Sequence, residues 1–405
     1  MRILTSVIAL LLAVLTAPAL ATSCQKTTPS FTHWLDEFKK EALAQGIAPQ
    51  TVAAASPEMS FDPAIVRRDR GQGVFSQTFL QFSDRMVAGY RLQNGALQIK
   101  KNPALFARIE QEFGVPAPVL TAFWGLESDF GANNGNYSIL RSLTTLAYDC
   151  RRADFFRAEL MDALRIVERG DQRVEDMKGD WAGEFGGMQI TASDYFKNGI
   201  DYDGDGKRDV IKSVPDTLAT AANFLKSLGW ERGQPWLQEV RVPANLPWQE
   251  ADLTIQHPRS QWVAWGVTPA YGALPADDMP ASLLLPMGRF GPAFLAYLNF
   301  KAFLGWNAAM VYSTTVAYYA TRLNGAPAVS RGSGPIEVLS PAQITELQTL
   351  LAKQGEDIGK IDGKFGAATR GAVKKYQIKF GLPADSYPNA ELISRLRGQP
   401  SGAAR

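Results

Sequence analysis

A glutamate among aromatic residues is the first candidate for chemistry in this chain. Residues 124–131 read Trp-Gly-Leu-Glu-Ser-Asp-Phe-Gly, with Glu127 in the fourth position. Pro116 and Pro118 predict the start of a helix that carries Glu127 near its C-terminal end, with Phe123 and Trp124 one turn earlier on the same face. Aromatic neighbours desolvate a carboxylate, and the negative helix end also disfavours its charge. Glu127 is therefore a candidate general acid, the alternative being a helix-terminal Glu that faces water.

Two further segments offer groups that can hold a sugar. Residues 180–189 read Asp-Trp-Ala-Gly-Glu-Phe-Gly-Gly-Met-Gln, where the small residues allow close backbone approach. Gln189 presents an amide that can bind an N-acetyl or hydroxyl group. Trp306, Asn307 and Tyr312 combine aromatic rings with an amide and can line a sugar cleft. Taken alone, the first segment is equally well explained as a glycine-rich turn and the second as core packing.

Residues 201–209 have the spacing of a calcium loop. Aspartates stand at positions 1, 3, 5 and 9 of the loop and glycine at position 6, and the candidate metal-site residues are Asp201, Asp203, Asp205, Lys207 and Asp209. Position 12 is Lys212 instead of a bidentate Glu, so we consider Asp216 as the source of the missing ligand. The alternative is a polar turn closed by aspartate hydrogen bonds.

The elements that must position these groups are mainly helical. Helical periodicity starts near Ser30, with Gly46 as a stop, and dominates to about residue 229, where Gly229 is expected at a C-cap. Residues 235–290 contain prolines and short alternating runs that predict a few short strands. Residues 292–323 again predict helix.

The composition of the C-terminal part indicates a separate small unit. Residues 324–337 are rich in Gly, Ala, Pro and Ser, which is typical of a linker. Residues 338–398 predict three short helices, a unit near the lower size limit for independent folding. From residue 338 to the end, ten Lys/Arg face six Asp/Glu, a mildly basic balance that suits an anionic polymer.

The N-terminus predicts export. A positive start, an apolar run from Ile3 to Leu15 and Ala19-Leu20-Ala21 form a signal peptide over residues 1–21. In an oxidising compartment Cys24 and Cys150, the two cysteines of the chain, are candidates for a disulfide. Lipid attachment at Cys24 is the less favoured alternative, because the residues before it match a lipoprotein signal poorly.

Composition also narrows the function. The formal net charge of +2 over 405 residues is too even for nucleic-acid binding. With only two histidines and no cysteine cluster, a zinc hydrolase is not expected, and no G-x-S-x-G motif is present.

Together, the segments around Glu127, Gln189, Asp201 and Asn307 resemble the membrane-bound lytic transglycosylase B family of murein-degrading enzymes, in order and spacing. The resemblance runs from about residue 31 to 323 and implies a lysozyme-like, mainly helical domain within residues 22–323. It implies that Glu127 is the catalytic acid and base, that Gln189, Asn307 and Tyr312 contact substrate, and that the aspartate loop binds calcium. Trp306 and Asp180 are included among the substrate-binding candidates.

The chain departs from the family pattern in three places. Many relatives carry Ser at the position of Asp180, so a second carboxylate is expected to raise the pKa of Glu127 or change the product. Ala309 stands where Ser is usual, and Ile-Thr-Ala follows Gln189 in place of Phe-Met-Pro.

The run from Ile361 to Leu382 resembles the three-helix peptidoglycan-binding domain. This domain indicates which polymer is bound and does not indicate the reaction.

The expected activity is cleavage of the bond between N-acetylmuramic acid and N-acetylglucosamine, with formation of 1,6-anhydromuramic ends. The protein is expected in the periplasm. Peptidoglycan is its expected partner, and other cell-wall enzymes are further candidates. No cofactor is expected for the chemistry, with calcium as a structural ion. A hydrolytic muramidase using Asp180, and a non-catalytic wall-binding protein, are the alternatives.

Overall fold

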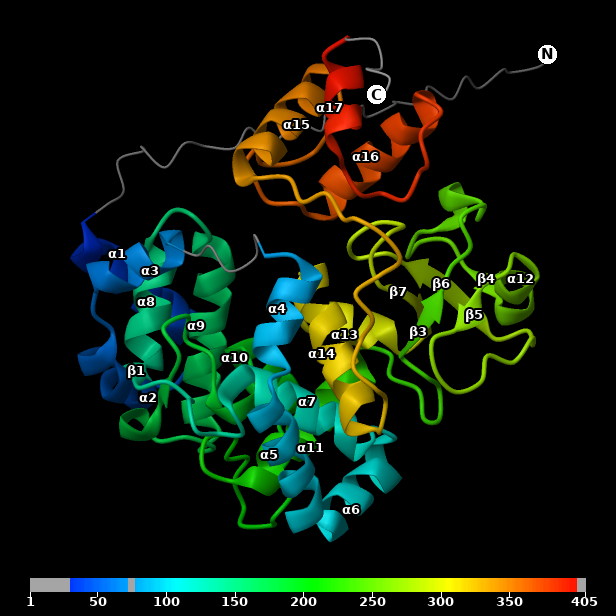
Figure 1. Ribbon diagram of the computed structural model, residues 1–405. Helices are drawn as coiled ribbons and strands as arrows, with labels where there is room; N and C mark the ends of the chain where they lie inside the picture. Colours follow the sequence, from blue (N-terminus) through cyan, green and yellow to red (C-terminus); the bar gives the residue numbers. More distant parts are fainter. Residues whose placement is uncertain (1–29, 72–76, 399–405) are drawn as a thin grey trace, which may run out of the picture.

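The computed structural model describes residues 30–71 and 77–398 (Figure 1). The predicted signal peptide and Cys24 lie outside the described residues. The described chain contains seventeen α-helices and seven short strands, which confirms the prediction of a mainly helical protein. Among these residues no helix is both long and apolar enough to span a bilayer.

The helices up to residue 227, together with helices nearer the C-terminus, form a helical body around one large core. Its helices up to residue 227 are α1 (Phe31–Ala44), α2 (Pro49–Ala55), α3 (Pro63–Arg70), α4 (Phe79–Met86), α5 (Gly89–Lys101), α6 (Pro103–Phe113), α7 (Ala117–Ser128), α8 (Ile139–Tyr148), α9 (Ala153–Glu168), α10 (Ala192–Asn198) and α11 (Val214–Ser227). The Ser30 hydroxyl caps α1 as expected, whereas Leu228 is the C-cap of α11 and Gly229 follows it with a φ of 92°. Two short strands, β1 (Tyr137–Ser138) and β2 (Lys178–Gly179), pair in antiparallel register.

Helix α7 is the central element of this body. Nine of its twelve residues are buried, and it packs against α5 and α14 (Met310–Leu323). Pro116 is its N-cap, as the sequence predicted, and Asp129 ends it in the left-handed conformation with a φ of 51°. Because almost every face of α7 is apolar, other parts of the core pack against it on all sides along its length. Only its C-terminal end lies outside this packing.

A five-stranded antiparallel sheet flanks the helical body, in the order β4-β6-β7-β3-β5. The strands are β3 (Leu237–Arg241), β4 (His257–Pro258), β5 (Thr268–Pro269), β6 (Pro280–Leu284) and β7 (Ala293–Ala296). With α12 (Arg259–Ala264) they enclose a second core around the fully buried Trp262.

The prediction of a helix throughout residues 292–323 is wrong at its start. Residues 293–296 form β7, which pairs with β3 on one side and β6 on the other. All four residues of β7 are buried, so this central strand reads as a continuous apolar run that periodicity cannot distinguish from a buried helix. Helix begins only at α13 (Phe300–Trp306), and α14 follows after a break.

The three predicted C-terminal helices are present as α15 (Pro341–Lys353), α16 (Ala367–Lys379) and α17 (Ala390–Leu396), around a third small core. The segment 324–337 before them has no helix or strand, and it lies against the rest of the molecule (Figure 1). The Ser330 N–H donates to Oε1 of Glu239 at 2.8 Å, and the Ser333 N–H donates to the Phe290 carbonyl at 2.8 Å.

Polar contacts hold the C-terminal unit against the sheet region. Lys374 forms a 3.1 Å ion pair with Asp252, and the Arg289 N–H donates to Asp385 at 3.0 Å. Both Lys374 and Asp385 are at least nine-tenths buried. The unit is therefore docked by desolvated, paired charges, which resist separation more than exposed pairs do.

Candidate active site

Glu127 is the penultimate residue of α7, where the helix meets three other segments of the chain. The helix ends sharply because Asp129 and Phe130 both have positive φ, of 51° and 62°. Arg91 from α5 holds Asp129 through a 2.7 Å ion pair. Left-handed non-glycine residues are costly and need support from their surroundings. The end of α7 is thus held in one conformation, and Glu127 with it.

Two donors from distant parts of the chain converge on one oxygen of Glu127. The indole N–H of Trp306 donates to Oε1 at 3.0 Å, and the phenol of Tyr312 donates to the same oxygen. The structure therefore brings together three of the site residues that the sequence singled out. Oε2 of Glu127 makes no hydrogen bond with a described residue.

Trp306 adds to the aromatic surroundings predicted for Glu127. Its indole lies at hydrogen-bonding distance, and Phe123 packs against it with ring centroids 4.4 Å apart. Trp124 packs edge-on against Phe130, with centroids 5.8 Å apart. Phe123 thus supports the indole that donates to Glu127, and Trp124 contacts the residue that follows the end of the helix.

This environment raises the pKa of Glu127 to about 7. Desolvation by burial is the largest cause, and the charge of Asp180 acts in the same direction. The hydrogen bonds from Tyr312 and Trp306 oppose it, because they stabilise the ionised form. A carboxyl group poised near neutral pH can both give and take a proton, which suits a general acid that later acts as a base.

The segment 180–189 lies directly against the end of α7. The Ser128 hydroxyl donates to the Gly187 carbonyl at 2.6 Å and accepts the Gly131 N–H at 2.8 Å. A Cβ at Gly187 would lie 2.8 Å from Nε1 of Trp124, so only glycine permits this approach. Ser128 was not singled out from the sequence, although it directly follows Glu127.

Asp180 shapes this segment with its carboxylate. Its Oδ1 accepts the N–H groups of Ala182 at 2.8 Å and Glu184 at 2.9 Å. Burial raises the pKa of Asp180, against the effect of these backbone hydrogen bonds. Both bonds are made by Oδ1, and the charge of Asp180 raises the pKa of Glu127.

Glu184 is a further buried acid that the sequence reasoning did not select. Its pKa is raised well above the ordinary value, by desolvation first and then by the charges of Asp180 and Glu127. The available signal was its position inside the segment 180–189, four residues after Asp180. Three carboxyl groups thus share this region, and repulsion among them disfavours their simultaneous ionisation.

Gln189 ends the segment in a left-handed conformation with a φ of 49°, and its N–H donates to the Gly186 carbonyl at 3.1 Å. Its side-chain amide makes no hydrogen bond with a described residue, so it is available to a ligand. The Oδ1 of Asn307 accepts the Ala309 N–H at 2.9 Å. This bond shapes the turn between α13 and α14, and so positions Trp306 on one side and Tyr312 on the other.

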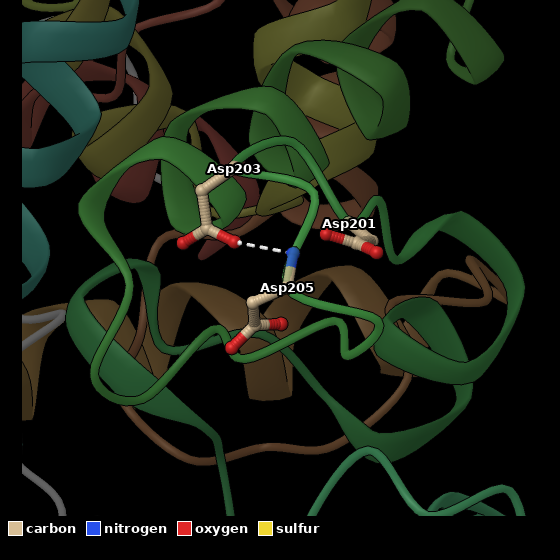
Figure 2. Close-up of side chains that lie close together, drawn as sticks. All are labelled: Asp201, Asp203 and Asp205. Carbon is tan, nitrogen blue, oxygen red and sulfur yellow. Dashed lines mark hydrogen bonds between the residues drawn. The ribbon is translucent and has the colours of Figure 1, made fainter.

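The aspartate loop connects α10 to α11. The carboxylates of Asp201, Asp203 and Asp205 each offer an oxygen within 4.8 Å of the others (Figure 2). Asp201 also accepts the N–H groups of Gly204 and Gly206, at 2.8 and 2.9 Å. Three hard oxygen donors on a closely wound backbone fit the donor set of a calcium ion.

The carboxylate of Asp209 is not part of this group of three. Asp209 accepts the Gln172 amide at 2.9 Å and the N–H groups of Ile211 and Lys212 at 3.0 Å. The Lys207 N–H donates to Asp205 at 2.9 Å. Asp216 is not positioned as the missing ligand: it is fully buried, and its carboxylate accepts the N–H groups of Tyr202, Asp203 and Asp209. Asp216 therefore holds the backbone of the aspartate loop through these three hydrogen bonds.

Cys150 is disulfide-bonded, and it directly follows Asp149, which pairs with Arg70 at 2.6 Å. The only other cysteine of the chain, Cys24, lies outside the described residues. The pairing of Cys24 with Cys150 therefore stays a prediction.

A mainly helical domain in which an indole and a phenol donate to one carboxyl group of raised pKa indicates the lysozyme-like class of glycan-cleaving enzymes. Residues 30–321 match the family model described as "Transglycosylase SLT domain", and residues 340–396 match a peptidoglycan binding domain. The chain belongs to the transglycosylase SLT domain family, whose members include lytic transglycosylases.

Individual relatives agree with this membership. SltB3 from Pseudomonas aeruginosa, solved in complex with NAG-anhNAM-pentapeptide, is 39% identical and superposes with a TM-score of 0.83 over 91% of this chain and 99% of that chain. Its complex with NAG-NAM-pentapeptide gives 40% identity, a TM-score of 0.84 and coverage of 91% and 100%. Membrane-bound lytic murein transglycosylase B of Escherichia coli is 28% identical over 242 residues, which are 59% of this chain and 65% of that protein. The match thus spans a little under two thirds of that relative.

Escherichia coli Slt35, solved in complex with calcium, has a similar fold, with a TM-score of 0.61 at 24% identity over 72% of this chain and 92% of that chain. The resemblance to the transglycosylase B family, and to the three-helix peptidoglycan-binding domain, is therefore confirmed.

Proposed function

We propose that this protein is a lytic transglycosylase that cleaves the β-1,4 bond between N-acetylmuramic acid and N-acetylglucosamine in peptidoglycan. The observation that carries the proposal is the environment of Glu127, which has a pKa of about 7 and two aromatic donors on one of its oxygens. Family membership supports it, as do the structures of the relative SltB3 in complex with NAG-NAM-pentapeptide and with NAG-anhNAM-pentapeptide.

Glu127 acts first as the acid. Because Oε1 accepts hydrogen bonds from both Trp306 and Tyr312, the proton of the neutral acid is held on Oε2. Oε2 gives this proton to the glycosidic oxygen, and the bond from that oxygen to C1 of the muramic residue breaks. The positive charge that develops at C1 is stabilised by the N-acetyl group of the substrate.

Glu127 then acts as the base. Its carboxylate, stabilised by Trp306 and Tyr312, takes the proton of the muramic C6 hydroxyl. The C6 oxygen bonds to C1 and closes the 1,6-anhydro ring, so no water is consumed and the acid is regenerated. Gln189, whose amide is free of bonds to described residues, is proposed to bind the glycan.

A hydrolytic muramidase remains the second candidate, because Asp180 and Glu184 place two more carboxyl groups near Glu127. A water activated by a second carboxylate would give a product one water heavier. The family match, and the complex of the relative SltB3 with NAG-anhNAM-pentapeptide, an anhydro-ended ligand, favour the transglycosylase over this alternative.

Mass spectrometry of products from purified sacculi tests the proposal. Residues 22–405 are expected to release anhydro-ended muropeptides, and the Glu127→Gln variant none, while still binding sacculi. Products one water heavier would replace the proposal with hydrolysis. Sacculus binding without any soluble product would favour a non-catalytic wall-binding protein.

The remaining functional assignments are also proposed. Calcium is a structural ion held by Asp201, Asp203 and Asp205, and the chemistry itself uses no cofactor. The chain is exported to the periplasm after loss of residues 1–21, with a transglycosylase domain over 22–323, a connecting segment over 324–337 and a peptidoglycan-binding domain over 338–398. The match of residues 340–396 to such a domain supports the last of these.

A further inference from the structure

Glu184 is a carboxylic acid close to Glu127 that the proposed reaction does not use. Its backbone is tied to Asp180 in both directions. The Glu184 N–H donates to Oδ1 of Asp180 at 2.9 Å, and the Glu184 carbonyl accepts the Asp180 N–H at 3.3 Å. The turn that carries Glu184 is therefore closed by hydrogen bonds within the protein.

The backbone that follows this turn fixes the direction in which Glu184 points. Phe185 is extended and forms bridges with Gly179 and with Ile190. Phe185 is fully buried and Ile190 is 2% exposed, so this pair faces the core. Because successive side chains of an extended segment point to opposite faces, Glu184 projects away from the core. It is partly exposed there.

On that face Glu184 lies close to Glu127 and to the phenol that donates to it. The charge of Glu127 raises the pKa of Glu184, and the charge of Glu184 raises the pKa of Tyr312. Interactions of this kind require short separations, since they weaken with distance and are screened by solvent. Glu184 therefore belongs to the immediate surroundings of the reacting acid.

The carboxyl group of Glu184 makes no hydrogen bond or ion pair with a described residue. Arg152, whose charge reaches Glu184, forms an ion pair with Asp69 at 2.5 Å. Glu159 offers a contrast, because its oxygens accept the N–H and the hydroxyl of Ser193 at 2.9 and 2.7 Å. A polar group that is partly shielded from water and has no protein partner is available to a ligand.

Glu184 still holds its proton where Glu127 acts as an acid. Desolvation is the largest cause of its raised pKa, followed by the charges of Asp180 and Glu127. Because the charge of Glu127 is among these causes, Glu184 loses its proton after Glu127 has ionised. A neutral carboxyl group donates a hydrogen bond, whereas a carboxylate only accepts.

We propose that Glu184 is a substrate-binding residue that donates a hydrogen bond from its neutral carboxyl group to an oxygen of the glycan beside the cleaved bond. The inference rests on the proposed function, because it takes the glycan as the ligand. Hydroxyl and N-acetyl oxygens of a sugar are neutral acceptors. A neutral donor binds them without adding a negative charge next to Glu127.

Two substitutions of similar length test this hydrogen bond. Glu184→Gln and Glu184→Met both remove the ionisable group, but only glutamine can donate. Each is combined with the inactive Glu127→Gln variant of residues 22–405 and titrated by calorimetry with NAG-NAM and with NAG-NAM-pentapeptide in slightly acidic buffer. We expect Glu184→Gln to bind both ligands as tightly as the protein that keeps Glu184, and Glu184→Met to bind them about tenfold more weakly.

The pH dependence of binding separates the hydrogen bond from packing, and it does not require the Met variant. With Glu184 in place, the affinity should fall as the pH is raised and the donor is lost, whereas the affinity of Glu184→Gln should fall less. The other charged groups that reach Glu184, namely Asp180, Arg152 and Glu159, are present in both proteins, as is Tyr312, so their titration is common to the comparison.

Equal affinities of the Gln and Met variants, or the same pH dependence with and without Glu184, would overturn the role of Glu184. The products of the wild-type chain distinguish this failure from failure of the proposed function. Anhydro-ended products together with equal affinities would refute the role of Glu184 alone, whereas products one water heavier would refute the proposed function whatever the affinities are.

Discussion

Tyr312 donates the hydrogen of its phenol to Oε1 of Glu127, although the two residues are 185 positions apart in the chain. Trp306 donates to the same oxygen, so Oε1 accepts two hydrogen bonds and Oε2 is left for the reaction. The two donors stabilise the ionised form, while burial stabilises the neutral form. The pKa near 7 is the balance of these opposing effects, and it can be shifted in either direction by single substitutions.

The first prediction concerns the pH dependence of the reaction. Cleavage requires protonated Glu127, and ionisation with a pKa of about 7 removes the acid. We expect kcat/KM to be nearly constant just below this pH and to fall about tenfold per pH unit above it. The rate of release of anhydro-muropeptides between pH 5 and 9, with the protein shown folded throughout by circular dichroism, measures this. A decline centred near pH 4.5 would mean that Glu127 is not desolvated during catalysis.

Removing the phenol of Tyr312 should move the decline to higher pH. Tyr312→Phe keeps the ring but deletes a hydrogen bond that lowers the pKa of Glu127. The expected shift is upward by about one pH unit, with a lower maximal rate because the carboxylate loses a stabilising donor. Tyr319→Phe is the matched control, since its buried hydroxyl donates to the Arg91 carbonyl instead. An unchanged midpoint in Tyr312→Phe would contradict the arrangement at Oε1.

Glu127 should also destabilise the fold at neutral and higher pH. The folded protein keeps the proton up to a pKa of about 7, whereas the unfolded chain loses it near 4.5. The free energy of unfolding therefore falls as pH rises from about 4.5 to 7 and is constant beyond. Relative to wild type, Glu127→Gln should gain up to about 3 kcal/mol between pH 4.5 and 8. Urea denaturation at both pH values measures the gain, and the exposed Glu110→Gln serves as control. A gain independent of pH would argue against a buried ionisation at Glu127.

How much of this site can be predicted from the sequence depends on how far apart in the chain the contacting residues are. The prolines before α7 and the motif around Glu127 locate the helix and its acid from local signals alone. Spacing along the chain cannot bring Trp306 and Tyr312 to Glu127, so their convergence was expected only from the family resemblance. The role of Asn307 in the turn before α14 depends on backbone geometry and was missed.

The errors in the fold have the same origin. β7 was predicted as helix because a strand buried on both faces has no alternation, and its pairing with β3 and β6 is set by residues far away in the sequence. Asp216 was considered as a calcium ligand because it lies close to the loop in the sequence. Sequence spacing does not reveal that its carboxylate oxygens already accept three backbone N–H groups.

Calcium should stabilise the protein through the aspartate loop. If only the folded state binds the ion, calcium at about 100 times its Kd should raise the free energy of unfolding by about 2.7 kcal/mol. Thermal unfolding in calcium against EDTA measures this, and Asp201→Ala should abolish the difference. Asp216→Asn should lower stability in both conditions, since Asp216 holds the loop backbone. An equal response to calcium in wild type and Asp201→Ala would place the ion elsewhere.

The last prediction separates the electrostatic role of Asp180 from a role in activating water. Asp180→Asn keeps an Oδ1 that can accept the N–H groups of Ala182 and Glu184, so the segment should hold its shape. It removes a charge that raises the pKa of Glu127, so the decline of kcat/KM should move to lower pH, opposite to the effect of Tyr312→Phe. The products should remain anhydro-ended in both proteins, because the C6 hydroxyl and not water attacks C1. If wild type instead released a product one water heavier, and Asp180→Asn lost that product selectively, Asp180 would be the base of a hydrolase.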